Sequence, residues 1–332
     1  VKLINLCYLL SKTYLQNFNS AKKEAPMDLK QLEYIVKIAE ENSITKAAEQ
    51  LYITQSALNQ QLLKLENELG TQLFHRSKND FRLTEAGNIY VSYAKRIIQL
   101  KHEAYGILND LANNKTGHLR IGLTPERGLQ MFVAVYPKFY KWYPKLTIEP
   151  LEISVKKQVS MISNGYLDLG FVTLHKREKE GYEYVHIKDE ELFLAVPSSH
   201  PLARQANAPG EPPAEMDLEY FKHERFALMF KESTMREVID ELFREAGFLP
   251  DILFESSSNH TLHTMVKNNL CCTILPEIYA VEDDKVAYFR LPSRPVWEIC
   301  AVYKKGSYLT KAGKDFINMA SLFWNSPEGS HC

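Results

Sequence analysis

The sequence predicts an α+β multidomain protein with a helical N-terminal part, one long helix, and a C-terminal part in which strands and helices alternate. The chain has 332 residues, which is enough for two or three domains at roughly 150 residues each. Apolar residues recur at helical spacing up to about residue 114. Beyond residue 117, short apolar runs alternate with helical patterns, as in an α/β domain.

Composition places the chain among ordinary globular proteins. Hydrophobic residues make up 45% and charged residues 24% of the chain, unlike disordered or collagen-like sequences. The 40 basic and 41 acidic residues give a net charge of −1, which excludes a strongly basic coat protein but allows a local nucleic-acid site. No run of 18 apolar residues occurs, so we expect no membrane partner.

The N-terminus and the cysteines indicate a cytoplasmic protein. We interpret residues 1–26 as an extension outside the fold, because the patterned sequence begins at Met27. The first residues lack the basic region and cleavage site of a signal peptide. The five cysteines form no CxxC pattern, so neither a zinc site nor a disulfide framework is expected. We expect the adjacent Cys271 and Cys272 to be buried apolar residues, with a redox switch as the alternative.

Residues 27–86 predict a helix-turn-helix followed by a hairpin. Small Ala47 and Ala48 allow two short helices to pack closely. Tyr52 and Ile53 then form a brief apolar turn before the third helix. Thr54 is a plausible N-cap of the third helix, in which leucines recur on one face, and Gly70 is its C-cap.

The third helix is a candidate recognition helix because its other face and its N-terminal tip are polar. The candidate base-reading and flanking residues are Thr54, Gln55, Ser56, Asn59, Gln60 and Lys64. Asn and Gln side chains can bind adenine through two hydrogen bonds. Any surface helix also has a solvated polar face, and from this helix alone the two readings stay open.

The segment 73–83 predicts a small hairpin with Asn79 and Asp80 at its turn. Its basic residues Arg76, Lys78 and Arg82 would reach the phosphate backbone as the wing of a DNA-binding domain. The alternative is a solvated run of charges.

A fourth helix begins after Thr84 and continues to about Asn114, so residues 87–116 form a linker helix. Its apolar residues recur at spacings of three and four. This seam consists of Tyr90, Tyr93, Ile97, Leu100, Ala104, Ile107 and Leu111. One helix cannot bury such a heptad seam against itself, so we predict pairing with a second subunit. Packing on its own domain is the alternative.

Residues 117–325 predict a parallel sheet covered on both sides by helices. In such folds ligands bind where strands end and helices begin. The candidates at these positions are Thr124, Pro125, Glu126, Arg127, Thr173, Ser233, Thr234, Ser257 and Asn259. Helix N-termini favour an anionic group, which Arg127 would help to bind and which Glu126 would oppose if it points inward. His260 and His263 have too few neighbouring ligands for a metal site, and no cofactor motif occurs.

With these motifs in place, the chain resembles the LysR-type transcriptional regulators from Met27 to the last helix. The strongest motifs are Thr45-Lys46-Ala47-Ala48, Thr54-Gln55-Ser56-Ala57-Leu58, Leu73-Phe74 with Arg76, and Leu83-Thr84-Glu85-Ala86-Gly87. Weaker similarities are Asn164-Gly165-Tyr166-Leu167-Asp168, His200-Pro201-Leu202-Ala203 and Leu275-Pro276-Glu277.

The resemblance implies a winged helix-turn-helix, a dimerising linker helix and an effector domain similar to type 2 periplasmic binding proteins. Lobe 1 of that domain would comprise about 117–193 and 294–325, and lobe 2 about 194–293, with Pro197 at the crossing between them. The implied partners are double-stranded DNA, a small effector with an anion among the candidates, RNA polymerase, and further copies of the chain in a homodimer or homotetramer. No enzymatic activity, cofactor or metal is implied.

The sequence departs from the family pattern at two places. Asn59 and Gln60 stand where members often have Ser and Arg, so the DNA sequence that is recognised should differ. Asn269 and Cys271 stand where glycines are usual, so the backbone there should differ too. A two-lobed solute receptor or enzyme is the alternative function, but it leaves the helix-turn-helix and the basic wing unexplained.

Overall fold

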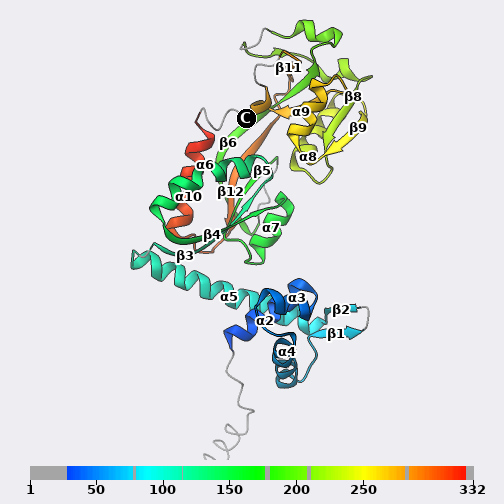
Figure 1. Cartoon of the computed structure of the whole chain (residues 1–332). Coiled ribbons are helices and arrows are strands. Elements are labelled where there is room, and N and C mark those ends of the chain that lie inside the picture. Colours follow the sequence, from blue (N-terminus) through cyan, green and yellow to red (C-terminus); the bar gives the residue numbers. More distant parts are fainter. Residues whose placement is uncertain are drawn as a thin grey trace, which may run out of the picture. The chain divides into compact units, whose positions relative to one another are not determined.

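The computed structural model (Figure 1) describes residues 28–77, 80–113, 115–175, 180–207, 211–280 and 284–326. Our predictions for residues 1–26 and for Lys78 lie outside this part. The chain divides into two compact units, one ending at His102 and the other beginning at Glu103. Within the described residues, no helix combines the length and the apolar character that crossing a membrane requires.

Three helices begin the first unit: α2 (Leu29–Glu41), α3 (Ile44–Gln50) and α4 (Gln55–Leu69). Their ends follow from local chemistry. The side chains of Ser43 and Thr54 accept hydrogen bonds from backbone N–H groups in the first turns of α3 and α4. Gly70 ends α4 in the left-handed conformation with a φ of 68°. The predicted helix-turn-helix is confirmed.

The wing and the long helix follow directly. Strands β1 (Phe74–Ser77) and β2 (Asp80–Leu83) pair antiparallel, and α5 extends over Glu85–Leu111. Thr84 caps α5 by accepting a hydrogen bond from the backbone N–H of Gly87 at 3.0 Å. A Cβ atom at Gly87 would lie 2.0 Å from the carbonyl oxygen of Leu73, so only glycine lets α5 approach the wing this closely.

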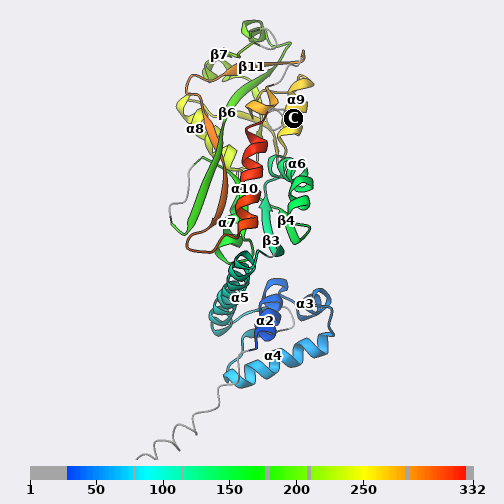
Figure 2. The ribbon, with the colours of Figure 1, turned by 90° about the vertical axis from the view of Figure 1, so that its left-hand side faces the viewer.

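The first lobe of the second unit is built on five strands and three helices. Its strands are β3 (Thr116–Leu123), β4 (Lys145–Glu152), β5 (Leu169–Leu174), the first part of β6 (Tyr182–Pro197), and β12 (Val296–Lys304). Its helices are α6 (Arg127–Trp142), α7 (Val155–Ser163) and α10 (Lys311–Trp324). Helices α6 and α10 lie side by side on one face of the sheet (Figure 2), and α7 covers the other.

Alternating side chains of the strands supply both faces of this lobe. Phe171 and Ile299 face α6 and α10 and pack with Phe316 of α10. Val172 and Cys300 face the other way and pack with Ile162 of α7. Period-two alternation with apolar residues on both faces is what a sheet between two helical layers requires.

The second lobe holds the remaining elements. Its strands are β7 (Ala214–Glu215), β8 (Arg225–Met229), β9 (Asp251–Ser256), β10 (Thr273–Pro276), β11 (Val286–Arg290) and the last part of β6. Its helices are α8 (Thr234–Glu245), α9 (Asn259–Lys267) and three short 3₁₀ helices, η1 (Pro201–Gln205), η2 (Leu218–Phe221) and η3 (Glu277–Tyr279). Phe226, Phe243 and Phe289 lie fully buried in its core.

The large sheet has the strand order β4-β3-β5-β12-β6-β11-β7, with β10 also paired to β6. Strands β3, β4 and β5 pair parallel, but β12 pairs antiparallel with both β5 and β6. The predicted all-parallel sheet is therefore wrong at its centre. The reason is topological: the chain leaves the first lobe along β6 and returns along β12, so these neighbours run in opposite directions.

The crossing between the lobes lies earlier in the chain than Pro197. Strand β6 pairs with β12 as far as Glu191 and with β10 from Leu192 onward. Pro197 lies at the far end of β6, opposite Val286. Our placement of Pro197 at the crossing is corrected, because β6 continues as one strand well into the second lobe. Its first half, 182–191, went unpredicted because it is rich in charged residues.

Asn269 and Cys271, which stand where the family usually has glycines, both lie in the second lobe. Asn269 adopts a φ of 58°, a conformation that glycine takes without cost and asparagine tolerates better than most residues. Cys271 and Cys272 are buried, free thiols. They occupy the interior as small apolar side chains, as predicted.

Candidate functional site

The face of α4 that carries the predicted reading residues is open to solvent. Gln55, Ser56 and Gln60 are exposed and Asn59 is half-buried, whereas Leu58, Leu62 and Leu65 of the opposite face are buried. The exposed Lys64 lies 3.9 Å from Glu68 of the same helix. Thr54 accepts a hydrogen bond from Ala57 N–H at 3.2 Å, so its first role is to start the helix.

Two residues near α4 differ from the sequence-based expectation. The guanidinium of Arg76 donates to the carboxylate of Glu66 in α4, so Arg76 holds the wing against the helix in addition to being basic. Tyr52 precedes α4 with a φ of 53° and is 95% exposed. Sequence reasoning treated it as an apolar turn residue. Arg82 in β2 is exposed, as a phosphate-binding residue must be.

The seam of α5 is not buried within the described part of the chain. Leu100 is 64% and Leu111 75% exposed, and Tyr93, Ala104 and Ile107 are exposed as well. The buried residues of α5 are Gly87, Val91 and Ala94, and two seam residues, Tyr90 and Ile97, are half-buried. The three buried residues lie off the seam, so the seam remains available to another helix.

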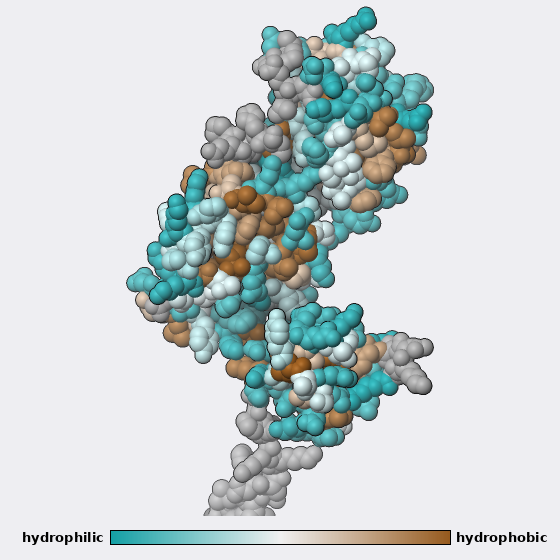
Figure 3. Space-filling model, viewed as in Figure 1, coloured by the Kyte–Doolittle hydropathy of each residue, from teal (hydrophilic) through white to brown (hydrophobic). Residues whose placement is uncertain are grey.

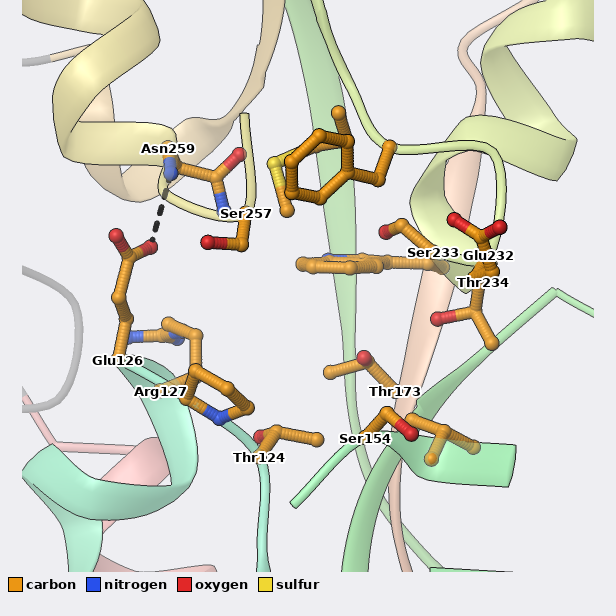
Figure 4. Close-up of a pocket in the computed structure, with 15 residues that line it drawn as sticks. Thr124, Glu126, Arg127, Ser154, Thr173, Glu232, Ser233, Thr234, Ser257 and Asn259 are labelled. Carbon is orange, nitrogen blue, oxygen red and sulfur yellow. Dashed lines mark hydrogen bonds between the residues drawn. The ribbon is translucent and has the colours of Figure 1, made fainter. Parts of the chain in front are cut away.

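A cavity of about 190 Å³ lies in the cleft between the lobes of the second unit, at the ends of β3, β5, β8 and β9 (Figure 4). It is small compared with the roughly 300–1,000 Å³ of pockets for drug-sized ligands. The N-termini of α6, α7, α8 and α9 all contribute residues to its wall. The first backbone N–H groups of a helix have no partner within the helix itself, and a helix N-terminus has a partial positive charge.

Nearly all the predicted effector residues line this cavity. They are Thr124, Pro125, Glu126, Arg127, Thr173, Ser233, Thr234, Ser257 and Asn259. Pro197 is absent from the lining because it lies at the far end of β6. The residues that sequence reasoning missed are Ser154, Val155, Met229, Phe230, Glu232 and Trp297. Ser154 had a usable signal, because it stands between a predicted strand and the next helix, like the residues that were found.

The four helix N-termini are capped differently. Ser154 accepts from Lys157 N–H at 3.4 Å in α7, and Ser258 accepts from Thr261 N–H at 3.1 Å in α9. The N-cap residues of α6 and α8, Glu126 and Ser233, make no side-chain hydrogen bond to their own helices. Helices α6 and α8 therefore begin without a side-chain cap, although the backbone N–H groups of Arg127 and Arg236 donate to the carbonyls of Pro125 and Ser233.

Arg127 is engaged within the protein. Its Nη2 donates to Glu190 at 2.7 Å, and both side chains are buried. The indole N–H of Trp297 donates to the other carboxylate oxygen of Glu190 at 2.9 Å. Burial raises the pKa of Glu190, while Arg127 and the Trp297 hydrogen bond act in the opposite direction. The positive charge of Arg127 is thus balanced by Glu190.

Glu126 contacts the other lobe. Its carboxylate accepts a hydrogen bond from the backbone N–H of Asn259 at 3.2 Å (Figure 4). It also accepts one from the hydroxyl of Ser258 at 2.6 Å. We had expected Glu126 to oppose an anion if it pointed inward. Instead it occupies the N-terminus of α9, a position of the kind at which the sequence predicts an anionic group.

The histidines do not form a metal site. The Nε2 atom of buried His263 lies 2.7 Å from the hydroxyl of Tyr288, and His260 is exposed. Across the described residues, no group of three or more His, Cys, Asp or Glu side chains is arranged to hold a metal ion.

Comparison with known proteins identifies both units. The bacterial regulatory helix-turn-helix family of lysR type matches residues 29–88, and the LysR substrate binding domain matches residues 112–322. The uncharacterized HTH-type transcriptional regulator YwbI of Bacillus subtilis is 30% identical over 92% of this chain and 99% of its own length. The chain belongs to the LysR family of transcriptional regulators.

Solved LysR-family structures share the fold. Full-length OxyR from Pseudomonas aeruginosa has a TM-score of 0.65 and 23% identity, covering 90% of this chain and 94% of its own. Full-length CbnR complexed with its target DNA has a TM-score of 0.56 and 23% identity, covering 89% of this chain and 99% of its own. This LysR regulator is thus a DNA-binding protein with an N-terminal helix-turn-helix and a C-terminal effector domain.

Proposed function

We propose that α4 reads the bases of double-stranded DNA in the major groove. The observation that carries this proposal is the polar face of α4, on which Gln55, Ser56 and Gln60 are exposed and Asn59 is partly exposed. Short amides and hydroxyls can donate to and accept from base edges. Arg82, Lys78 and Lys64 hold phosphates, which fixes the register of the helix on the duplex. Thr54 starts the helix, Arg76 positions the wing, and exposed Tyr52 reaches the backbone beside them.

The protein works as a homodimer or homotetramer. Pairing of two α5 seams removes exposed leucines from water and places two recognition helices on two half-sites. A second apolar patch lies over β9 (Figure 3). Its exposed residues are Leu249, Ile252, Leu253 and Phe254. Exposed apolar patches of this kind mark association surfaces, and a tetramer needs a second surface beyond the α5 seam.

The effector is a small molecule that binds in the cleft between the lobes. Its anionic group faces the N-termini of α8 and α6, which have no side-chain cap, near Ser233, Thr234 and Thr124. Phe230, Val155 and Trp297 supply apolar walls for its remainder. Binding in the cleft shifts an equilibrium between arrangements of the lobes, and thereby between oligomers that contact DNA differently.

The regulator senses its ligand in the cytoplasm without converting it, and it acts on RNA polymerase at the promoters that it binds. The pocket lining consists of hydroxyls, apolar groups, the amide of Asn259, two carboxylates and an arginine whose charge is balanced. This set suits recognition through hydrogen bonds and apolar contact.

The test compares binding to the DNA upstream of the regulator's own gene with binding to unrelated duplex over a range of salt concentrations. We expect a clear preference for the upstream DNA and a steep salt dependence from phosphate contacts. A receptor or enzyme without DNA function would show no preference, and that result would refute the proposal. Screening metabolites for a rise in melting temperature identifies the effector.

A further inference from the structure

One side chain, Glu126, connects the two lobes through four hydrogen bonds. Its Oε1 atom accepts from the hydroxyl of Ser258 at 2.6 Å and from His260 N–H at 3.4 Å. Its Oε2 atom accepts from Asn259 N–H at 3.2 Å and from the hydroxyl of Tyr279 at 3.2 Å. Glu126 belongs to the first lobe, whereas all four donors belong to the second.

Glu126 stands at the N-cap of α6, yet it caps α9. Its own carbonyl accepts from Gln130 N–H at 2.8 Å, so α6 begins there without help from the side chain. The backbone is bent sharply at this residue, with φ 60° and ψ −80°, and Arg127 N–H donates to the carbonyl of Pro125 at 2.8 Å. This is a γ-turn of the rare positive-φ kind, which is strained for a residue other than glycine. The turn aims the carboxylate across the cleft.

The carboxylate fills the place that an external anion would take at α9. A helix N-terminus stabilises a negative charge through its free N–H groups and its partial positive charge. At α9 two of these N–H groups, together with the hydroxyls of Ser258 and Tyr279, already donate to Glu126. At α8, on the same cavity, the N-cap Ser233 makes no side-chain hydrogen bond to its helix.

We infer that Glu126 is a built-in anion that latches the two lobes and determines which effectors fit the cleft. It excludes an anionic group from α9 and directs the anionic end of the effector toward α8. The part of the effector nearest α9 is therefore neutral or cationic. The inference about the effector rests on the proposed ligand site in the cleft, whereas the latch itself is a property of the ligand-free protein.

The latch is tested by chemical rescue with acetate in the full-length chain. Glu126→Ala leaves a space of carboxylate size beside α9, and we expect the melting temperature to fall by about 2–6 °C. Sodium acetate should then raise the melting temperature of the variant saturably, beyond the effect of sodium chloride at equal ionic strength. Acetate that binds the proposed anion site at α8 stabilises both proteins alike, so rescue is defined as the rise in the variant's melting temperature beyond the rise in wild-type protein. Equal acetate responses of the two proteins would overturn the inference.

Three further variants keep the test decisive. Glu126→Gly adopts the positive φ without strain. It replaces Glu126→Ala in the acetate titration if the alanine variant folds poorly, and we expect acetate to rescue it too. Glu126→Gln keeps the size of the side chain but not its charge, and it should gain no more from acetate than wild-type protein does. Glu237→Ala removes an exposed contact to Lys156, 3.7 Å away across the cleft, and it too should respond like wild-type protein. Rescue of Glu126→Gln or Glu237→Ala by acetate would refute the latch. So would the absence of rescue in Glu126→Ala and Glu126→Gly when both are folded.

The readout separates this inference from the proposed function. Acetate rescue needs no effector and no DNA, so an effector screen that finds no ligand in the cleft would refute the proposed site and leave a positive rescue standing. If an effector is found, wild-type protein should prefer a compound with one anionic end over an analogue with anions at both ends. In Glu126→Ala the ratio of the affinities for these two compounds should fall at least severalfold. An unchanged ratio would show that Glu126 does not determine which effectors bind.

Discussion

The guanidinium of Arg76 in the wing donates to the carboxylate of Glu66 in the recognition helix. Glu66 is only 7% exposed, and its other oxygen accepts the backbone N–H groups of Leu73 at 2.8 Å and Phe74 at 3.3 Å. One buried carboxylate therefore fixes the start of β1 relative to α4. The relative placement of base-reading and phosphate-binding residues depends on this connection.

Glu66→Ala should destabilise the DNA-binding unit by about 2–4 kcal/mol, because it leaves two buried N–H donors and a guanidinium without their acceptor. Urea unfolding followed by circular dichroism measures the change. The matched control is Glu68→Ala on the same helix, whose pair with Lys64 is exposed and worth at most about 1 kcal/mol. Similar losses in the two variants would contradict the structural role of Glu66.

Gln60→Ala and Arg82→Ala should affect DNA binding in opposite ways. Loss of the Gln60 amide should relax the preference at one or two base pairs and leave the salt dependence unchanged. Loss of the Arg82 charge should weaken binding on all sequences and flatten the salt slope by about one unit. Binding measured on a library of single-base variants at several salt concentrations separates these effects. A loss confined to one base position in Arg82→Ala would argue against a phosphate contact.

Leu100→Lys should lower the molecular mass measured by sedimentation, because it places a charge in the exposed seam of α5. Leu100 is 64% exposed within the chain, so the substitution should leave the folded protomer intact. Ser92→Lys, at an exposed position of α5 outside the seam, serves as the control and should leave the assembly unchanged. If both variants sediment like the wild-type protein, the seam is not the dimer contact.

The three buried cysteines should react slowly with a thiol reagent in the native protein. Burial raises the pKa of Cys271 to about 11 and raises the pKa of Cys272 as well. At about pH 8 roughly one Cys271 thiol in a thousand is then ionised. The measurement uses a Cys7→Ser, Cys332→Ser double variant, with and without urea. One fast thiol in the native state would instead support a redox switch.

The sequence predicted the local elements of the first unit well, because their signals are local. Thr54 and Gly70 mark the ends of α4 through side-chain capping and a left-handed φ of 68°, and the leucines of α4 mark its buried face. Leu69, in the last turn of α4, is the one leucine of this face that is exposed. Local signals could not reveal that Arg76 would find its partner in Glu66, ten residues earlier.

The second unit shows where such reasoning fails. The predicted strands and helices are present, but antiparallel pairing of β12 with β5 and β6 depends on the path of the chain between two lobes. The pocket residues were found by one rule, that ligands bind where strands meet helices, and Pro197 was misplaced because the length of β6 was not foreseen.

By itself the sequence determined the order of reader, linker helix and sensor, along with the side chains available to each, because periodicity and caps act over a few residues. Only the tertiary structure decided which charged side chains already have a partner within the protein. Arg127 is balanced by Glu190, 63 positions away, and Glu126 binds α9 more than 130 positions away. Charges that look free in the sequence lose that freedom on folding, since a buried or helix-capping charge must find a partner.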